Sequence, residues 1–340
     1  EKDRKKFESD IADINTRYKV FNIFLDSLKL KKEHKEYLNT ERQLSDEIIA
    51  RRKYKSCQYA TDTFMKDFLE KLNNSDVEYI DGKGIRKRGE EVLEHIPGFY
   101  KKKSKGKWQW TFPYNKGIFI PIRNAKGKIA GLQIRRDKKD EHRGRYFWFS
   151  SSFAQYNDKY KHGVSSGSPM DVLYPDKEVL DKLEFSRPTK ILFITEGRFK
   201  SEAIIKKIAS VSISVQGVGN WKGIDKVIKK AEKQVKEMYP NHPGFERVYV
   251  AYDSDMSYKY QVYEQLKKMT DYLRERTNLK LYYLHWTDGY KGIDDTLLNS
   301  NCKSPRQCGC LFNVYDKTYW DEEYARQLKD IMEKKGVKKP

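Results

Sequence analysis

The chain has 340 residues, with 69 lysines and arginines against 49 aspartates and glutamates, and its formal net charge is +20. This excess predicts a polyanionic partner, and it favours nucleic acid over an anionic membrane. The mean hydropathy is −0.89 and no apolar run reaches the roughly 18 residues of a membrane span, so the sequence excludes a membrane-spanning protein. No signal peptide is recognisable, and we expect a cytoplasmic location. Because the chain begins at Glu1 and not at Met, we also expect it to be a fragment.

The four cysteines are too few for a disulfide framework. Cys302, Cys308 and Cys310 lie close together in the sequence, but they form no C-x2-C pair. A zinc site there needs Cys57 or a histidine as its fourth ligand. We favour reduced thiols in a loop and leave zinc binding open.

The first 105 residues are predicted to form a basic helical region. Apolar residues recur at helical spacing over 14–28 and 64–72, and Thr61 or Asp62 is a suitable cap for the second helix. A turn signal ends this region at 96–100, and 101–107 is predicted to be an exposed basic loop. The role of this region stays open.

Residues 106–188 are predicted to form a basic, β-rich subdomain. Two strands are expected at 117–123 and 128–135, joined by a hairpin turn that places a glycine at position 127. A third strand is expected at 146–149. Pro121 indicates an edge or a bulge in the first strand.

Residues 189–300 alternate between strands and helices, which predicts an α/β fold with a parallel, doubly wound sheet. Amphipathic helices are expected between the strands. The expected strands are 190–195, 211–216, 247–252 and 279–285. Residues 301–340 are predicted to be a polar tail with a helix from about residue 319.

Acidic residues follow three of these elements. Glu196 follows the first strand, Asp253 and Asp255 follow the third, and Asp294 and Asp295 follow the turn after the fourth. Loops at the carboxyl ends of parallel strands line one crevice, so these carboxylates are expected to converge. Hard oxygen ligands suit Mg²⁺ or Mn²⁺, although aspartates at such turns are also ordinary helix caps. With a basic chain, the pattern indicates phosphoryl chemistry on nucleic acid.

The motifs Thr195-Glu196-Gly197 and Asp253-Ser254-Asp255 resemble those of a Toprim domain, the metal-binding module of bacterial primases, topoisomerases and some nucleases. The resemblance covers 190–297. Upstream, 117–131 is similar to a Phe-Pro-Ile-Arg hairpin of the DnaG-type primase core, and the segments 145–151 and 161–163 resemble further parts of that core. The fold that this implies is a Toprim-type parallel sheet flanked by helices, preceded by the β-rich and helical regions. The sequence is most similar in character to primase-like proteins of phages, plasmids and other mobile genetic elements.

This resemblance implies a DNA primase, a nucleotidyltransferase of DNA replication that makes short primers from nucleoside triphosphates on single-stranded DNA. Glu196, Asp253 and Asp255 are the implied catalytic residues. The same three residues, with Asp294 and Asp295, are the implied ligands of Mg²⁺ or Mn²⁺. A replicative helicase stays open as a further partner. The expected contacts to nucleic acid and nucleoside triphosphate are Arg123, Arg135, Arg145, Lys161 and Lys200.

The sequence departs from the primase pattern at two points. Lys200 stands where bacterial primases have an acid, four residues after the glutamate, and the last acidic pair is adjacent instead of being an Asp-x-Asp motif. Two other functions therefore stay open. One is a Toprim-type metal-dependent nuclease, and the other is a catalytically silent single-stranded-DNA-binding module that recruits a helicase.

Overall fold

The computed structural model describes residues 11–138, 144–257, 259–286, 289–302 and 305–334. The chain divides into two compact units, Glu1–Pro169 and Met170–Pro340. The finer boundaries expected at residues 105, 188 and 300 remain predictions. No helix in the described ranges is long and apolar enough to cross a bilayer.

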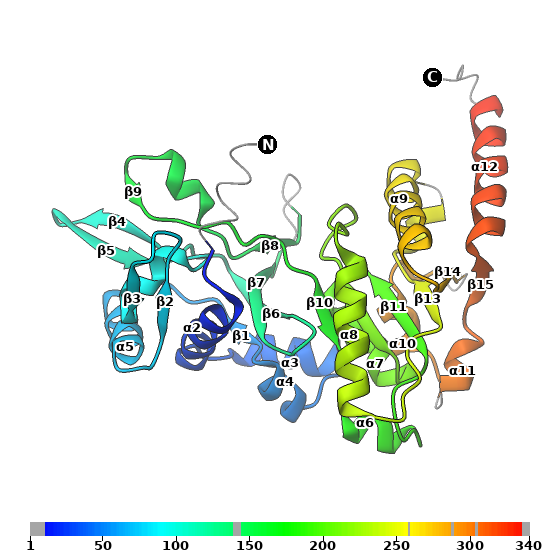
Figure 1. The fold of residues 1–340 in the computed structure, drawn as a ribbon, viewed down its shortest axis with the longest axis horizontal. Helices are drawn as coiled ribbons and strands as arrows, with labels where there is room; N and C mark the ends of the chain where they lie inside the picture. Colours follow the sequence, from blue (N-terminus) through cyan, green and yellow to red (C-terminus); the bar gives the residue numbers. More distant parts are fainter. Residues whose placement is uncertain (1–10, 139–143, 258, 287–288, 303–304, 335–340) are drawn as a thin grey trace. The chain divides into compact units, whose positions relative to one another are not determined.

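The first unit combines helices with short antiparallel strands (Figure 1). The region predicted to be helical also contains four strands, β1 to β4. The elements of this unit are α2 (Ile14–Ser27), α3 (Lys32–Thr40), α4 (Asp46–Arg52), β1 (Lys55–Ser56), α5 (Asp62–Asn73), β2 (Glu78–Ile80), β3 (Arg86–Arg88), η1 (Gly89–His95), β4 (Tyr100–Ser104), β5 (Lys107–Thr111), β6 (Gly117–Arg123), β7 (Ile129–Arg136), β8 (Tyr146–Trp148), η2 (Ser152–Tyr156) and β9 (Tyr160–Lys161).

The main sheet of this unit has the order β1-β6-β7-β8 and is antiparallel throughout. The predicted hairpin is confirmed as β6 and β7, and Gly127 in its turn has a φ of 73°, which a glycine adopts without strain. The register shifts between Ile122 and Arg123, next to Pro121. Pro121 lies beyond the two residues of β6 that pair with β1, so its missing N–H removes no bond to that strand.

Phe24 of α2 lies at the centre of an aromatic core in the first unit. Its ring packs edge-on against Phe68, Phe99 and Phe119, with centroids 5.1–5.5 Å apart, and it stacks on Phe149. All five side chains are fully buried. Because large buried aromatic rings contribute much of the apolar area that a core removes from water, this cluster fixes α2 and α5 onto the sheet.

The segment predicted to be an exposed basic loop is instead part of a second sheet, β5-β4-β9. Strand β4 pairs with β5 over its whole length and with β9 at Lys101 and Lys102. Lys101 and Lys161 lie over the rings of Trp110 and Trp108, each ammonium 4.6 Å from a ring centroid. The lysines at 102, 103, 105 and 107 are exposed as predicted. The segment nevertheless forms strands, because it pairs with neighbouring strands, which a run of charges does not reveal.

The second unit is an α/β sheet with flanking helices. The four strands and three intervening helices expected for it are confirmed within a few residues. Its elements are β10 (Asp171–Leu173), α6 (Lys177–Lys182), β11 (Ile191–Thr195), α7 (Arg198–Ile208), β12 (Val211–Ser214), α8 (Ile224–Met238), β13 (Arg247–Val250), η3 (Ser254–Ser257), α9 (Tyr260–Arg276), β14 (Lys280–His285), α10 (Ile293–Asn299), α11 (Pro305–Gly309), β15 (Asn313–Asp316) and α12 (Lys317–Lys334).

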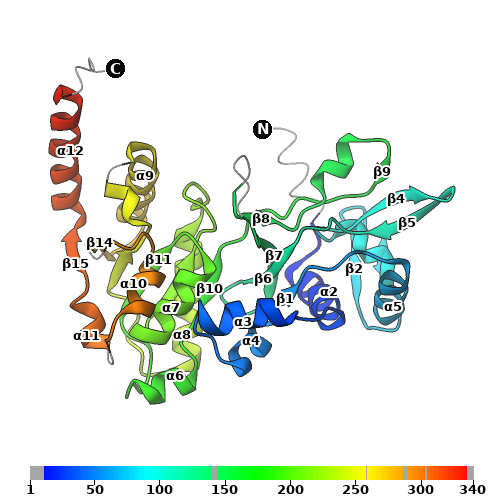
Figure 2. The ribbon, with the colours of Figure 1, turned by 180° about the vertical axis from the view of Figure 1, so that it is seen from behind.

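The sheet of the second unit has the order β10-β12-β11-β13-β14-β15. Its four central strands are parallel, and the two outer strands are antiparallel to their neighbours. In Figure 1 helix α8 lies in front of the sheet, and in the reverse view of Figure 2 helices α7 and α10 lie in front of it. One apolar cluster joins α7 and α10 to the sheet through Ile204, Phe193, Leu284 and Leu297. Because β11 and β13 are parallel neighbours, their carboxyl ends lie side by side at the same end of the sheet.

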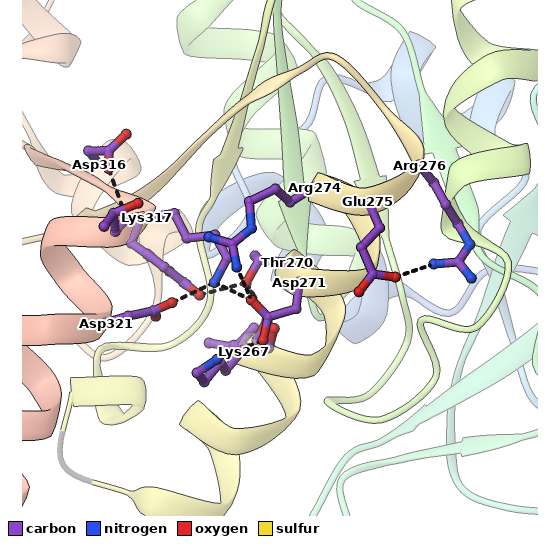
Figure 3. A network of polar contacts seen from close by, with 12 residues as sticks. Lys267, Thr270, Asp271, Arg274, Glu275, Arg276, Asp316, Lys317 and Asp321 are labelled. Carbon is purple, nitrogen blue, oxygen red and sulfur yellow. Dashed lines mark hydrogen bonds and ion pairs between the residues drawn. The ribbon is translucent and has the colours of Figure 1, made fainter.

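The last helix is attached to α9 by a buried network, drawn in Figure 3. Lys317, whose side chain is only 4% exposed, has its Nζ 2.9 Å from Asp271 and 2.5 Å from Asp321. The hydroxyl of Tyr263 donates to the other oxygen of Asp321 over 2.5 Å, and Lys267 pairs with Asp271 at 2.7 Å. The tail helix predicted from about residue 319 is thus confirmed as α12, and it is anchored to the unit.

Cys302 and Cys308 form a disulfide, so the expectation of reduced thiols is wrong for this pair. The sequence spacing did not show that the turn around α11 brings the two sulfurs together. Cys310 is exposed and Cys57 is buried, and neither is in a disulfide.

Candidate metal centre and nucleic-acid interface

The predicted carboxylates do meet at the carboxyl ends of β11 and β13. Glu196 directly follows β11, and Asp253 and Asp255 follow β13. The backbone N–H of Asp253 donates to Oε1 of Glu196 over 2.9 Å. The two loops are also joined through the sheet, where the N–H of Ala251 donates to the carbonyl of Ile194. This parallel pairing places two of the predicted acidic motifs within hydrogen-bonding distance.

Helix α7 places a lysine among these carboxylates. Lys200 lies one turn into the helix, with its Nζ 2.8 Å from Oδ1 of Asp253 and 3.8 Å from Oε1 of Glu196. All three side chains are largely buried, with 13–18% exposed. Glu196 lies before the helix, in the turn between β11 and α7, and the start of α7 brings Lys200 back toward it.

Helix α10 adds Asp294 to the cluster. Asp294 is 8% exposed and lies in the first turn of α10. A Cβ on Gly292, the N-cap residue just before this helix, would lie 2.3 Å from Oδ1 of Asp294 and 3.5 Å from Cε of Lys200. A side chain at this position would therefore require the Asp294 carboxylate to shift. Asp295 is the next residue on the helix and is rotated by about 100° from Asp294, so the two predicted ligands do not face the same point.

Burial and charge shift the pKa values of this cluster in different directions. Burial raises the pKa of the Glu196 carboxyl, with Lys200 opposing the rise and Asp253 adding to it. Burial also acts against ionisation of Asp253, but Lys200 and Lys291 outweigh it and lower its pKa. For Lys200 burial favours the neutral amine, yet the carboxylates of Glu196, Asp253 and Asp294 raise its pKa. Lys200 is therefore a fixed positive charge, and Asp253 is its ionised partner.

Two more lysines lie on the solvent side of the cluster, and sequence reasoning missed both. Lys291 lies 3.0 Å from Oδ2 of Asp253 and 3.5 Å from Oδ2 of Asp255. Lys259 pairs with Asp255 at 2.7 Å. Both side chains are more than half exposed. The segment Lys-Gly before the acidic pair was the available signal for Lys291, and the four-residue spacing from Asp255 was the signal for Lys259.

The donor chemistry of this cluster fits a divalent cation. Asp253 and Asp255 offer hard carboxylate oxygens, the type that Mg²⁺ and Mn²⁺ prefer. Within the described ranges no three His, Cys, Asp or Glu side chains are grouped closely enough to hold a metal alone. Mg²⁺ is usually held by one or two carboxylates, with waters and substrate phosphates completing its shell. Asp253 and Asp255 are thus suited to such an ion.

The glycine-containing loop after β12 lies beside the carboxylates, at the same end of the sheet. The N–H of Gly217 donates to the carbonyl of Glu196 over 3.2 Å, and the N–H of Asn220 donates back to the carbonyl of Gly217. The amide of the Asn220 side chain donates to Gln216. These bonds describe a tight turn beside the carboxylates.

The basic residues predicted for the first unit fall into two groups. Arg123 donates to the carbonyls of Gly127 and Arg52, and Arg135 is 4% exposed with its guanidinium 4.0 Å from the ring centroid of Tyr37. These two side chains make contacts inside the unit. Arg145 and Lys161 are exposed, so they are the two of the four that are available to a polyanion.

Comparison with known proteins shows which solved structures have a similar fold. A family model described as a domain of unknown function, DUF3854, matches residues 185–304. No curated protein sequence is significantly similar to the chain. Among solved structures, the zinc-binding and RNA polymerase domains of the Aquifex aeolicus primase give a TM-score of 0.54 at 16% identity, over 88% of this chain and 61% of that one.

Two further primase structures cover most of both chains. The DnaG primase catalytic domain bound to single-stranded DNA gives a TM-score of 0.53 at 14% identity, over 91% of this chain and 82% of that one. The RNA polymerase domain of the Mycobacterium tuberculosis primase DnaG gives 0.54 at 13% identity, over 92% and 86%. The chain has a mixed α/β fold similar to DnaG primase catalytic cores. At these identities the likeness concerns the fold.

Proposed function

We propose that the chain is a DnaG-type primase core with a Toprim domain in its second unit. It would make short primers on single-stranded DNA from nucleoside triphosphates. The observation that carries this proposal is the convergence of Glu196, Asp253 and Asp255 at the ends of two adjacent parallel strands. The fold shared with primase cores and the +20 charge support the same conclusion.

Five residues of the centre have a role in this proposal. Asp253 and Asp255 hold Mg²⁺ or Mn²⁺, which when bound neutralises phosphate charge and lowers the pKa of an attacking hydroxyl. Glu196 accepts the proton of the primer 3′-hydroxyl, because a carboxylate whose pKa is raised is a stronger base. Lys291 and Lys259, exposed beside the aspartates, bind the phosphates of the incoming nucleotide.

The template contacts are proposed for the first unit. Arg145 and Lys161 are exposed there and bind phosphates of the single strand, while Arg123 and Arg135 support the sheet. The helicase partner and the mobile-element origin remain predictions from the sequence resemblance.

The test is primer synthesis on single-stranded DNA with labelled nucleoside triphosphates and Mg²⁺ or Mn²⁺. The chain is compared with the double variant Asp253→Ala/Asp255→Ala, whose fold is checked by circular dichroism. Short labelled products that disappear in the variant are expected. A shortened template with no new strand would identify a nuclease instead. No labelled product from the wild-type chain would contradict the proposal.

One observation favours a second candidate, a DNA-binding module without catalysis. Lys200 and Lys291 lie 2.8 Å and 3.0 Å from the two oxygens of Asp253, so this carboxylate already has cationic partners within the protein. A binding module holds single-stranded DNA equally well with Mg²⁺ and with chelator. A primase needs the ion for synthesis. Filter binding and synthesis measured side by side, with and without EDTA, separate the two candidates.

A further inference from the structure

Lys200 differs from every other cation around the carboxylates in being enclosed. Its side chain is 17% exposed, against 63% for Lys291 and 55% for Lys259. It leaves α7 on the helix face that is covered by α10, and its Cε lies 3.5 Å from the point where a Cβ on Gly292 would stand. A stem enclosed in this way has less freedom to move into solvent than the side chains of the two exposed lysines.

The ammonium of Lys200 also occupies the space in which a metal ion would contact the same oxygens. Its Nζ is 2.8 Å from Asp253 and 3.8 Å from Glu196, and it interacts electrostatically with Asp294. A divalent ion bound between these carboxylates would lie within a few ångströms of a fixed positive charge. In a site this enclosed, that repulsion is screened only weakly.

We propose that Lys200 is a built-in cation that fills one of the cation positions of this centre. The chain consequently binds at most one divalent ion there. This ion lies on the side of Asp255, where the exposed side chains of Lys291 and Lys259 can move away from the carboxylates. The inference deepens the proposed function, since it concerns the ion content of the same centre. It is tested by ion binding alone. The inference can therefore fail although primer synthesis is observed, and it can hold although no primer is made.

The first arm of the test counts ions. Mn²⁺ is titrated into the chain by electron paramagnetic resonance, with Asp253→Ala/Asp255→Ala as the variant that defines background binding. One Mn²⁺ above background is expected for the wild-type chain, and two for Lys200→Met. Two Mn²⁺ above background in the wild-type chain, or an unchanged count in Lys200→Met, would overturn the proposal.

The second arm measures thermal unfolding of Lys200→Met with EDTA and with Mn²⁺. Loss of the ammonium leaves Glu196, Asp253 and Asp294 without their shared cation, so the variant is expected to melt lower in EDTA. Mn²⁺ should restore its melting temperature more than it raises that of the wild-type chain, because the ion takes the vacated position. A variant that Mn²⁺ does not restore, including one that stays unfolded, counts against the proposal.

Lys206→Met is the matched control. Lys206 lies on the same helix and is also partly buried, but its charged neighbours are Lys207 and Lys182, and its pKa is lowered by burial. This variant should show the wild-type Mn²⁺ count and the wild-type response of melting to Mn²⁺. An extra ion in Lys206→Met would show that the gain in Lys200→Met is not specific to the centre.

Discussion

Two buried lysines of the second unit have similar partners and different surroundings. Lys317 lies between Asp271 and Asp321, and Lys200 lies between Asp253 and Glu196. Around Lys317, the aspartates also bind other side chains of α9, and the network joins two helices (Figure 3). Around Lys200, the partner carboxylates lie on loops at the carboxyl ends of parallel strands.

This difference is the reason why we propose a functional role for the network of Lys200 and a structural role for that of Lys317. A buried lysine with two carboxylates is an ordinary way to fix one helix on another, so it gives no evidence of a ligand by itself. Asp253 and Asp255 differ because their remaining partners, Lys291 and Lys259, are exposed and replaceable. The position at the strand ends, where ligands of α/β sheets bind, supports the proposed function of this cluster.

The largest expected effect compares one aspartate from each network. Asp253→Asn should slow primer synthesis by about 100-fold or more, since a metal ligand supplies several kcal/mol of transition-state stabilisation. Asp271→Asn should leave synthesis per folded molecule unchanged. Single-turnover rates of both variants, corrected for folded fraction, measure this. Equal losses in both variants would remove the distinction.

Lys317→Met should destabilise the fold by about 2 kcal/mol. Removal of one partner of a fully buried pair costs more, but Asp271 and Asp321 retain some exposure, which reduces the loss. The melting temperature should fall by roughly 4–8 °C. Unlike Lys200→Met, this variant should not be restored by Mn²⁺. Lys268→Met, which breaks an exposed pair with Glu264, serves as control and should change stability by less than about 0.5 kcal/mol.

Asp271 should also contribute to the loss of stability at acid pH. Burial acts to raise its pKa, but Lys267 and Lys317 outweigh that effect and lower the pKa below its ordinary value of 3.8. The unfolded chain therefore binds this proton first, so the stabilisation is complete above the ordinary value and disappears as pH falls through the lowered pKa. Asp271→Asn should show a shallower loss of stability between about pH 4 and pH 2 in denaturant titrations. An unchanged slope would contradict the assigned ion pairs.

The smallest effect concerns the exposed basic residues of the first unit. If Lys161 contacts one phosphate, Lys161→Ala should reduce the slope of log affinity against log salt by about 0.7 for single-stranded DNA. Lys268→Ala, an exposed lysine of α9, should leave the slope unchanged. Fluorescence anisotropy over a salt series measures both. Equal slopes for wild type and Lys161→Ala would exclude this phosphate contact.

The sequence predicted the convergence of Glu196 and Asp253 better than the contacts around them. Strands with buried apolar runs, such as β11 and β13, are recognisable because their periodicity and length are local properties. Glu196 and Asp253 could be placed together because parallel strands end at the same edge. The charge partners Lys291 and Lys259 were missed, because their weak sequence signals do not distinguish them from the many other lysines of the chain.

The failures have a common physical cause. Strand β4 was predicted to be a loop because its run of lysines indicates a solvated segment, whereas its pairing with β5 and the contact of Lys101 with Trp110 are contacts between strands. The Cys302–Cys308 disulfide and the network of Lys317 also depend on contacts across loops and helices. Arg135 was expected at the surface as a phosphate contact, and it is buried against Tyr37 of α3. Composition and spacing carry little information about such contacts.

The most direct test of the account is to locate the ion. Crystals of the chain grown with Mn²⁺ and a nucleoside triphosphate analogue would be measured by anomalous scattering at the manganese edge. The account predicts one peak within about 2.2 Å of a carboxylate oxygen of Asp253 or Asp255, with Lys200 still beside Asp253 and no peak at Asp271 or Asp321. No peak at the strand ends, or one in place of the Lys200 ammonium, would contradict it.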